Sequence, residues 1–173
     1  MSTSNPEIHD PIPDSFRVSV IMQQSPSRSA WLTRQWQAVG ILAAGQDSAA
    51  KGEVTLIHQE GEVSRYLYSG FSLRLYVDEC ESYYHNLLSS EPRCYVVASQ
   101  ADDGTPVPFL VSLSFDEAHA YLEGDETVYA VAVPAEVYRW TETFVLAHYV
   151  PTKRTKRKRA DWKKNSGRRP HEA

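Results

Sequence analysis

The sequence predicts an α+β protein with a mostly antiparallel sheet of about six or seven strands, three helices and a disordered basic C-terminal tail. Three observations lead to this fold class. Short segments rich in β-branched and aromatic residues are separated by turn-forming residues, as in hairpins. Three other segments place apolar residues at helical spacing. The basic residues, finally, are concentrated after position 152.

The first part of the chain predicts two strands, at residues 16–22 and 36–42, because both segments are rich in apolar residues and the first is also rich in β-branched ones. The intervening serine and proline residues are typical of a turn. Residues 43–52 are small and polar and are expected to form a loop.

The clearest hairpin follows this loop, with strands predicted at residues 54–57 and 63–68. Gly61 lies between them and can take the positive φ that a tight turn requires. Gly70 is expected to separate the second strand from a third one, at residues 71–77. In this third segment apolar and polar side chains alternate, which predicts a strand with one buried face.

The spacing of apolar residues changes at Asp78, which is expected to cap the first helix. Pro92 follows the helix, and residues 94–98 predict the next strand. An apolar stripe at helical spacing predicts a buried helix face made of Cys80, Tyr83, Tyr84, Leu87 and Leu88.

The last part of the chain predicts a strand at residues 107–113, and two prolines place its start at a sheet edge or outside the ladder. Ser114 and Glu117 have the spacing of a capping box and predict a short helix. Residues 127–133 predict another strand, and Pro134 then begins the last helix. The short helix is expected to turn Phe115, Ala118 and Leu122 inward. In the last helix one face is expected to be shared by Val137, either Trp140 or Thr141, Phe144 and His148.

The sequence predicts a single globular domain at residues 16–152, after a flexible leader at residues 1–15 and before the tail at residues 153–173. Up to Thr152 there are 20 acidic and 8 basic residues, a net charge of −12, whereas the tail has 10 basic and 2 acidic residues, a net charge of +8. The tail contains too few apolar residues to offset the ordering of its backbone. We therefore expect it to be disordered.

The N-terminal segment has no basic and apolar pattern of a secretory signal, and no apolar run approaches the roughly 20 residues that span a bilayer. A soluble, cytoplasmic protein without membrane insertion is expected. Phosphate-binding, dinucleotide-binding and zinc-protease motifs are missing from the sequence. Cys80 and Cys94 are not at metal or disulfide spacing, and no cofactor or metal is expected. The chain is therefore predicted not to be an enzyme, with a small enzyme that pairs Cys94 with a histidine as an alternative.

Aromatic residues and the basic tail are the candidate binding residues. Trp31, Trp36 and Tyr83 are predicted contacts with a protein partner. The tail is expected to bind nucleic acid, an acidic protein or its own acidic domain, or to remain solvated. Its candidate contacts are Lys153, Arg154, Lys156, Arg157, Lys158 and Arg159, with Trp162 available to stack on a base.

Four groups of short motifs lie in residues 16–159. They are Trp31 and Trp36 before Val39-Gly-Ile-Leu42; Tyr66 to Leu75; Tyr83-Tyr-His-Asn-Leu87, Pro92 and Tyr95-Val-Val97; and Val131-Ala-Val-Pro134, Trp140 and His148-Tyr-Val-Pro151. Together these motifs resemble a proteobacterial family that is catalogued as a domain of unknown function. This family is often encoded beside formate dehydrogenase subunits and their maturation proteins, which implies an accessory role in assembling a molybdenum- or tungsten-dependent enzyme. No catalytic residues are established for it, so none is transferred.

Together these observations lead to the hypothesis of a non-enzymatic accessory protein that binds a formate dehydrogenase subunit or a maturation partner. The domain would supply the specific surface, and the tail would speed association electrostatically. The alternative is a nucleic-acid-binding protein that acts through the basic tail. The acidic domain argues against this alternative, because it would repel a polyanion.

Overall fold

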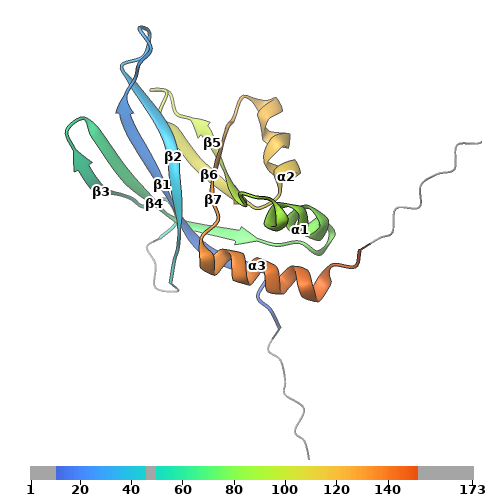
Figure 1. The fold of residues 1–173 in the computed structure, drawn as a ribbon. Coiled ribbons are helices and arrows are strands. Elements are labelled where there is room, and N and C mark those ends of the chain that lie inside the picture. The colour runs from blue at the N-terminus through green and yellow to red at the C-terminus, as the bar shows by residue number, and fades with distance from the viewer. Residues whose placement is uncertain (1–10, 46–49, 152–173) are drawn as a thin grey trace, which may run out of the picture.

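The computed structural model describes residues 11–45 and 50–151. Within these residues, seven strands and three α-helices follow one another along the chain (Figure 1). The α+β class is therefore confirmed for this part of the chain. The strands are β1 (Ser15–Pro26), β2 (Arg34–Ala43), β3 (Val54–Glu60), β4 (Val63–Arg74), β5 (Arg93–Gln100), β6 (Pro106–Ser112) and β7 (Thr127–Ala132), and the helices are α1 (Cys80–Leu88), α2 (Phe115–Ala120) and α3 (Ala135–His148).

The strands form two antiparallel sheets, so the prediction of one sheet is wrong. The order is β2-β1-β4-β3 in the larger sheet and β6-β5-β7 in the smaller one. The chain leaves the larger sheet after β4 to form α1, and β5 then pairs with β6 and β7 instead of β4. Because β2 lies beside β7 and β4 beside β6, the two sheets enclose one core.

The core is made by the inner faces of both sheets, and α3 closes one end of it (Figure 1). Val20 of β1 and Val96 of β5 are fully buried in it. Trp140 of α3 packs against Phe16 with ring centroids 5.3 Å apart, and its indole N–H donates to the carbonyl of Pro13 at 2.7 Å. Pro13, which lies in the predicted leader, is thus hydrogen-bonded to the last helix.

β4 is one continuous strand, whereas the sequence predicted a break at Gly70. Gly70 has φ +88°, and a Cβ built at this position would lie 2.2 Å from Cα of Lys51. The register with β1 shifts at this point, between Val18 and Val20. The glycine therefore forms a bulge that bends the strand and lets another segment approach closely, without ending the strand.

α1 begins after a 3-10 turn at Val77–Glu79, so Asp78 is not its cap. The predicted apolar stripe is only partly confirmed, because Tyr84 and Leu88 are exposed. Tyr84 instead stacks on Tyr149, which follows α3, at a centroid distance of 4.8 Å. The helix thus uses a narrower face than predicted, made of Cys80, Tyr83 and Leu87.

Half of the predicted capping box of α2 is confirmed, since the side chain of Ser114 accepts a hydrogen bond from the backbone N–H of Glu117 at 3.2 Å. The reciprocal bond is replaced, because the backbone N–H of Ser114 donates to the hydroxyl of Ser112, which in turn donates to the Glu117 carboxylate. Of the three residues predicted to face inward, Ala118 is buried, but Phe115 and Leu122 are exposed. The helix is too short to bury a wide face, and Phe115 packs edge-on against Tyr95 and against the ring of His119 on the same helix. α3 follows the prediction more closely, with Val137, Trp140, Thr141 and Phe144 buried and His148 exposed.

No helix in residues 11–45 and 50–151 is long and apolar enough to cross a membrane.

Candidate protein-interaction surface

The β1–β2 hairpin projects from the end of the molecule opposite α3 (Figure 1). Its strands stay paired out to Pro26 and Arg34, beyond the point at which β4 stops pairing with β1. Serine side chains order the tip. Ser27 accepts from the backbone N–H of Ser29 at 3.1 Å, and Ser29 accepts from that of Trp31 at 3.3 Å. The tip is therefore a defined turn.

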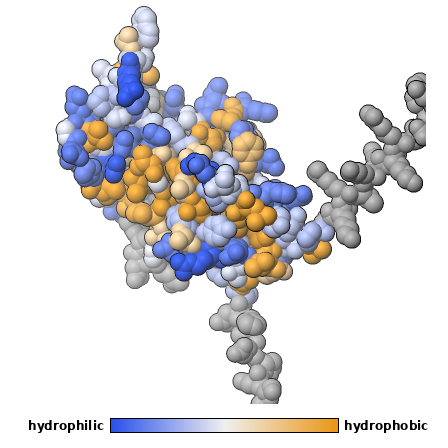
Figure 2. All heavy atoms as spheres, in the orientation of Figure 1, coloured by the Kyte–Doolittle hydropathy of each residue, from blue (hydrophilic) through white to orange (hydrophobic). Residues whose placement is uncertain are grey.

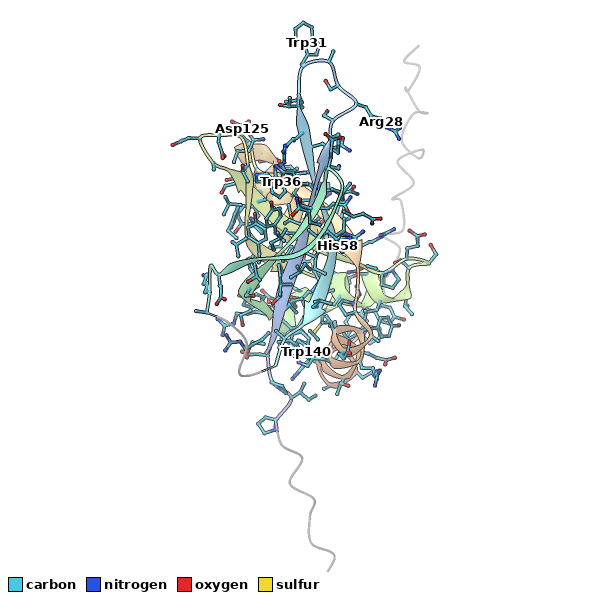
Figure 3. All side chains as sticks on the ribbon, turned by 90° about the vertical axis from the view of Figure 1, so that its left-hand side faces the viewer. Arg28, Trp31, Trp36, His58, Asp125 and Trp140 are labelled. Atoms are coloured by element: carbon cyan, nitrogen blue, oxygen red, sulfur yellow. The ribbon has the colours of Figure 1, made fainter. Side chains whose placement is uncertain are left out.

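Trp31 stands at this tip and points away from the protein (Figure 3). Its exposed fraction is 93%, and that of the adjacent Leu32 is 62%. A tryptophan buries a large apolar area when it is covered, and tryptophan is enriched among the residues that dominate binding energy. Trp31, predicted from the sequence as a partner contact, is thus in a position to insert into another protein.

Two arginines flank the exposed tryptophan, at positions 28 and 34 (Figure 3 labels Arg28). Arg34 donates to the side-chain oxygen of Gln24 at 2.7 Å. Neither arginine forms an ion pair with another residue in the described part of the chain. Arginine and tryptophan together are the usual composition of a binding hot spot. Arg28 was not among the contacts predicted from the sequence, although its place between a serine-proline turn and Trp31 was a usable signal.

Trp36 lies lower on the same hairpin and is half-buried. Its ring packs against Tyr66 of β4 at a centroid distance of 5.6 Å. It also lines a hollow of about 380 Å³ between the hairpin and the β5–β6 turn. Trp36 can therefore extend a contact that Trp31 begins. The hollow is lined by Gln24, Trp31, Leu32, Thr33, Arg34, Trp36, Asp103, Gly104 and Thr105.

Tyr83 is not available to a partner, and its prediction as a surface contact is wrong. Its exposed fraction is 1%, and its hydroxyl accepts a hydrogen bond from the backbone N–H of Tyr76 at 3.2 Å. Burial raises its pKa, and the nearby carboxylates of Glu117 and Glu79 add to the shift. The apolar spacing of α1 had already indicated this buried role. The structure therefore assigns Tyr83 to the core.

The predicted contacts of the basic tail, from Lys153 to Trp162, lie outside the described residues. Their roles in binding therefore stay predictions.

Cys94, the nucleophile of the alternative enzyme hypothesis, is fully buried in β5. Burial raises the pKa of its thiol from the ordinary value of 9.0 to about 12. A reactive cysteine needs a thiolate and an accessible position. The properties of Cys94 therefore argue against a Cys94 nucleophile.

Strand β3 adds a feature that the sequence analysis did not identify. All seven of its residues are exposed, among them Val54, Leu56 and Ile57. Figure 2 shows apolar side chains among polar ones over the larger sheet. The apolar residues before the Gly61 turn predicted a strand here, but no local pattern indicates that it lies at an open edge.

The comparisons with known proteins give one match. The model of a family described as "Protein of unknown function (DUF3305)" matches residues 17–159, most of the chain. No curated protein and no solved structure matches the chain.

Proposed function

We propose that the chain, which belongs to the DUF3305 family of proteins of unknown function, is a non-enzymatic accessory protein that binds another protein through its β1–β2 hairpin. The observation that carries the proposal is the 93% exposure of Trp31 at an ordered tip. A side chain of this size is normally covered, because transfer of apolar surface out of water is favourable. A partner with an apolar pocket would cover it.

The partner is proposed to be a formate dehydrogenase subunit or one of its maturation factors, in the cytoplasm. This part of the proposal rests on the gene neighbourhood implied by the resemblance described above, which is an association and not a physical argument. The physical argument concerns the kind of surface. Arg28 and Arg34 beside Trp31 favour a pocket that is apolar inside and has acidic residues at its rim.

The test is a nuclease-treated pull-down from the native host with the full-length chain and its Trp31→Ala variant. The unsubstituted chain is expected to recover a formate dehydrogenase subunit or maturation factor. With the purified partner, Trp31→Ala should weaken binding about 30-fold, the loss typical of a hot-spot residue. Leu146→Ala is the control, because Leu146 is 80% exposed on α3, at the opposite end of the molecule. Equal binding by all three proteins would refute the proposed hairpin contact.

The alternative, binding of nucleic acid by the tail, is favoured by the charge of +8 in residues 153–173. About six phosphate contacts would weaken binding about 10³-fold between about 50 and 200 mM salt. A chain that ends at Thr152 separates the two functions. If nucleic acid were the sole partner recovered and both nuclease and truncation removed it, the accessory function would be abandoned.

A further inference from the structure

β3 forms an open edge of the larger sheet. In the described part of the chain it pairs with β4 on one side, while its other side faces solvent. The exposed fractions of Val54, Leu56 and Ile57 are 49%, 50% and 45%. An edge strand with free backbone groups and apolar side chains is a template for another strand.

The other sheet edges in the described residues are protected. β6 contains Pro106 and Pro108, which lack a backbone N–H and block strand addition. The edges of β2 and β7 lie beside each other. β3 contains neither proline nor lysine, and its one irregularity is a register shift between Leu56 and His58. This shift twists the edge without covering it.

The charges around β3 indicate which kind of strand fits. Glu53, Glu60 and Glu62 are exposed at its two ends, against two basic residues, Lys51 before the strand and Arg65 opposite His58 on β4. Arg65 donates to the side-chain oxygen of Gln23 on β1, the strand on the other side of β4. A second copy of the chain would bring the same carboxylates together. For example, antiparallel pairing centred between Leu56 and Ile57 places Glu53 opposite Glu60 of the copy, and like charges directly opposite destabilise a sheet. A segment that carries lysine or arginine is favoured instead.

We infer that β3 is a strand-addition site for an extended segment of a partner protein in which apolar and basic residues alternate. The inference rests on the proposed protein-binding function and adds a second, separate contact to it. Backbone hydrogen bonds hold the segment, and its apolar side chains cover the side of β3 that carries Leu56. In the sheet register, Leu56 lies opposite Tyr66, which in turn contacts Trp36 of the hairpin. The added strand would therefore lie next to Tyr66 and extend the aromatic surface formed by Tyr66, Trp36 and Trp31.

The probe is a synthetic peptide that alternates valine and lysine over 7 residues, the length of β3. It is titrated into the full-length chain and followed by NMR, with amide hydrogen exchange at the end point. The amides of β3 are expected to gain protection. Leu56→Lys should weaken binding about tenfold or more, because it adds repulsion and removes apolar contact at the edge. The matched control is Leu42→Lys on β2, since Leu42 is 48% exposed at the other edge of the same sheet.

Three results would overturn the inference: equal loss of binding in both variants, protection outside β3, or equal affinity for a peptide with glutamate in place of lysine. Self-association in sedimentation that Leu56→Lys abolishes would also overturn it, because the occupant would then be a second copy. Failure of the proposed function is distinguishable. A Trp31→Ala variant that keeps its partner while the peptide still protects β3 would refute the hairpin contact alone.

Discussion

Two tryptophans at opposite ends of the molecule show how differently its two halves are built. Trp140 in α3 is 8% exposed, and its indole N–H is hydrogen-bonded to the carbonyl of Pro13. Trp31 at the hairpin tip is 93% exposed, and its environment orders only its backbone. The end closed by α3 thus buries Trp140, whereas the hairpin exposes Trp31 and β3 exposes the aliphatic side chains of Val54, Leu56 and Ile57. This difference is the basis of our proposal that the second end binds a partner.

The largest expected effect is a difference in the free energy of unfolding between alanine variants of these two tryptophans. Trp140→Ala should lower the free energy of unfolding by about 3–5 kcal/mol, because it leaves a cavity and an unpaired carbonyl. Trp31→Ala should change it by less than about 0.5 kcal/mol. Urea denaturation of both variants measures the contrast. Similar losses would show that Trp31 also stabilises the fold.

Gly70 lies in β4 between the end of the molecule that α3 closes and the end that carries the β1–β2 hairpin and β3. Gly70→Ala should cost about 3 kcal/mol or more, because it combines a positive φ with a Cβ 2.2 Å from Cα of Lys51. Gly61→Ala is the control, since Gly61 has φ +57° but open space around it, and should cost about 1 kcal/mol. Equal losses in thermal unfolding would mean that the close approach of Lys51 is not maintained.

Alkaline pH should lower the free energy of unfolding of the domain through the buried thiol of Cys94. Below about pH 9 its thiol is neutral in both states, but at higher pH the unfolded chain loses the proton, while the folded chain retains it up to about pH 12. The free energy of unfolding should then fall by up to about 1.4 kcal/mol per pH unit from this group. Urea unfolding from pH 7.5 to about 10.5 measures this slope. Cys94→Ala should make it shallower, and an unchanged slope would contradict the assignment.

The smallest expected effect is a difference in local stability within the unmodified protein. Amides of β3 should exchange hydrogen faster than those of β5, because β3 is exposed on every residue whereas Cys94, Val96 and Val97 of β5 are fully buried. Hydrogen exchange followed by NMR gives both rates. Comparable protection in the two strands would indicate that β3 is already covered in the full-length chain.

The elements were largely predictable, because each depends on neighbouring residues. Segments rich in β-branched and aromatic residues between turn residues predicted the strands, the spacing of Ser114 and Glu117 predicted the N-cap of α2, and apolar spacing predicted the buried face of α3. Gly70 was misinterpreted because a glycine that ends a strand and one that forms a bulge look alike in sequence. Only the close approach of Lys51 distinguishes the two cases.

The site was less predictable, because exposure depends on the whole fold. Trp31 and Tyr83 were proposed as contacts by the same argument, yet one is at a hairpin tip and the other is in the core. The open edge at β3 depends on which strands pair, and the division into two sheets was not predicted. Residue type indicated which side chains were candidate contacts, and the tertiary structure determined which of them are exposed.

The most direct test of the partner-binding end is photo-cross-linking in the native host. A photoreactive phenylalanine analogue is placed at position 31 in one protein and at position 146 in another, both of which are exposed. The account predicts a cross-link from position 31 to a formate dehydrogenase subunit or maturation factor, and none to that protein from position 146. Cross-linking to that protein from position 146 alone, or equally from both positions, would contradict it.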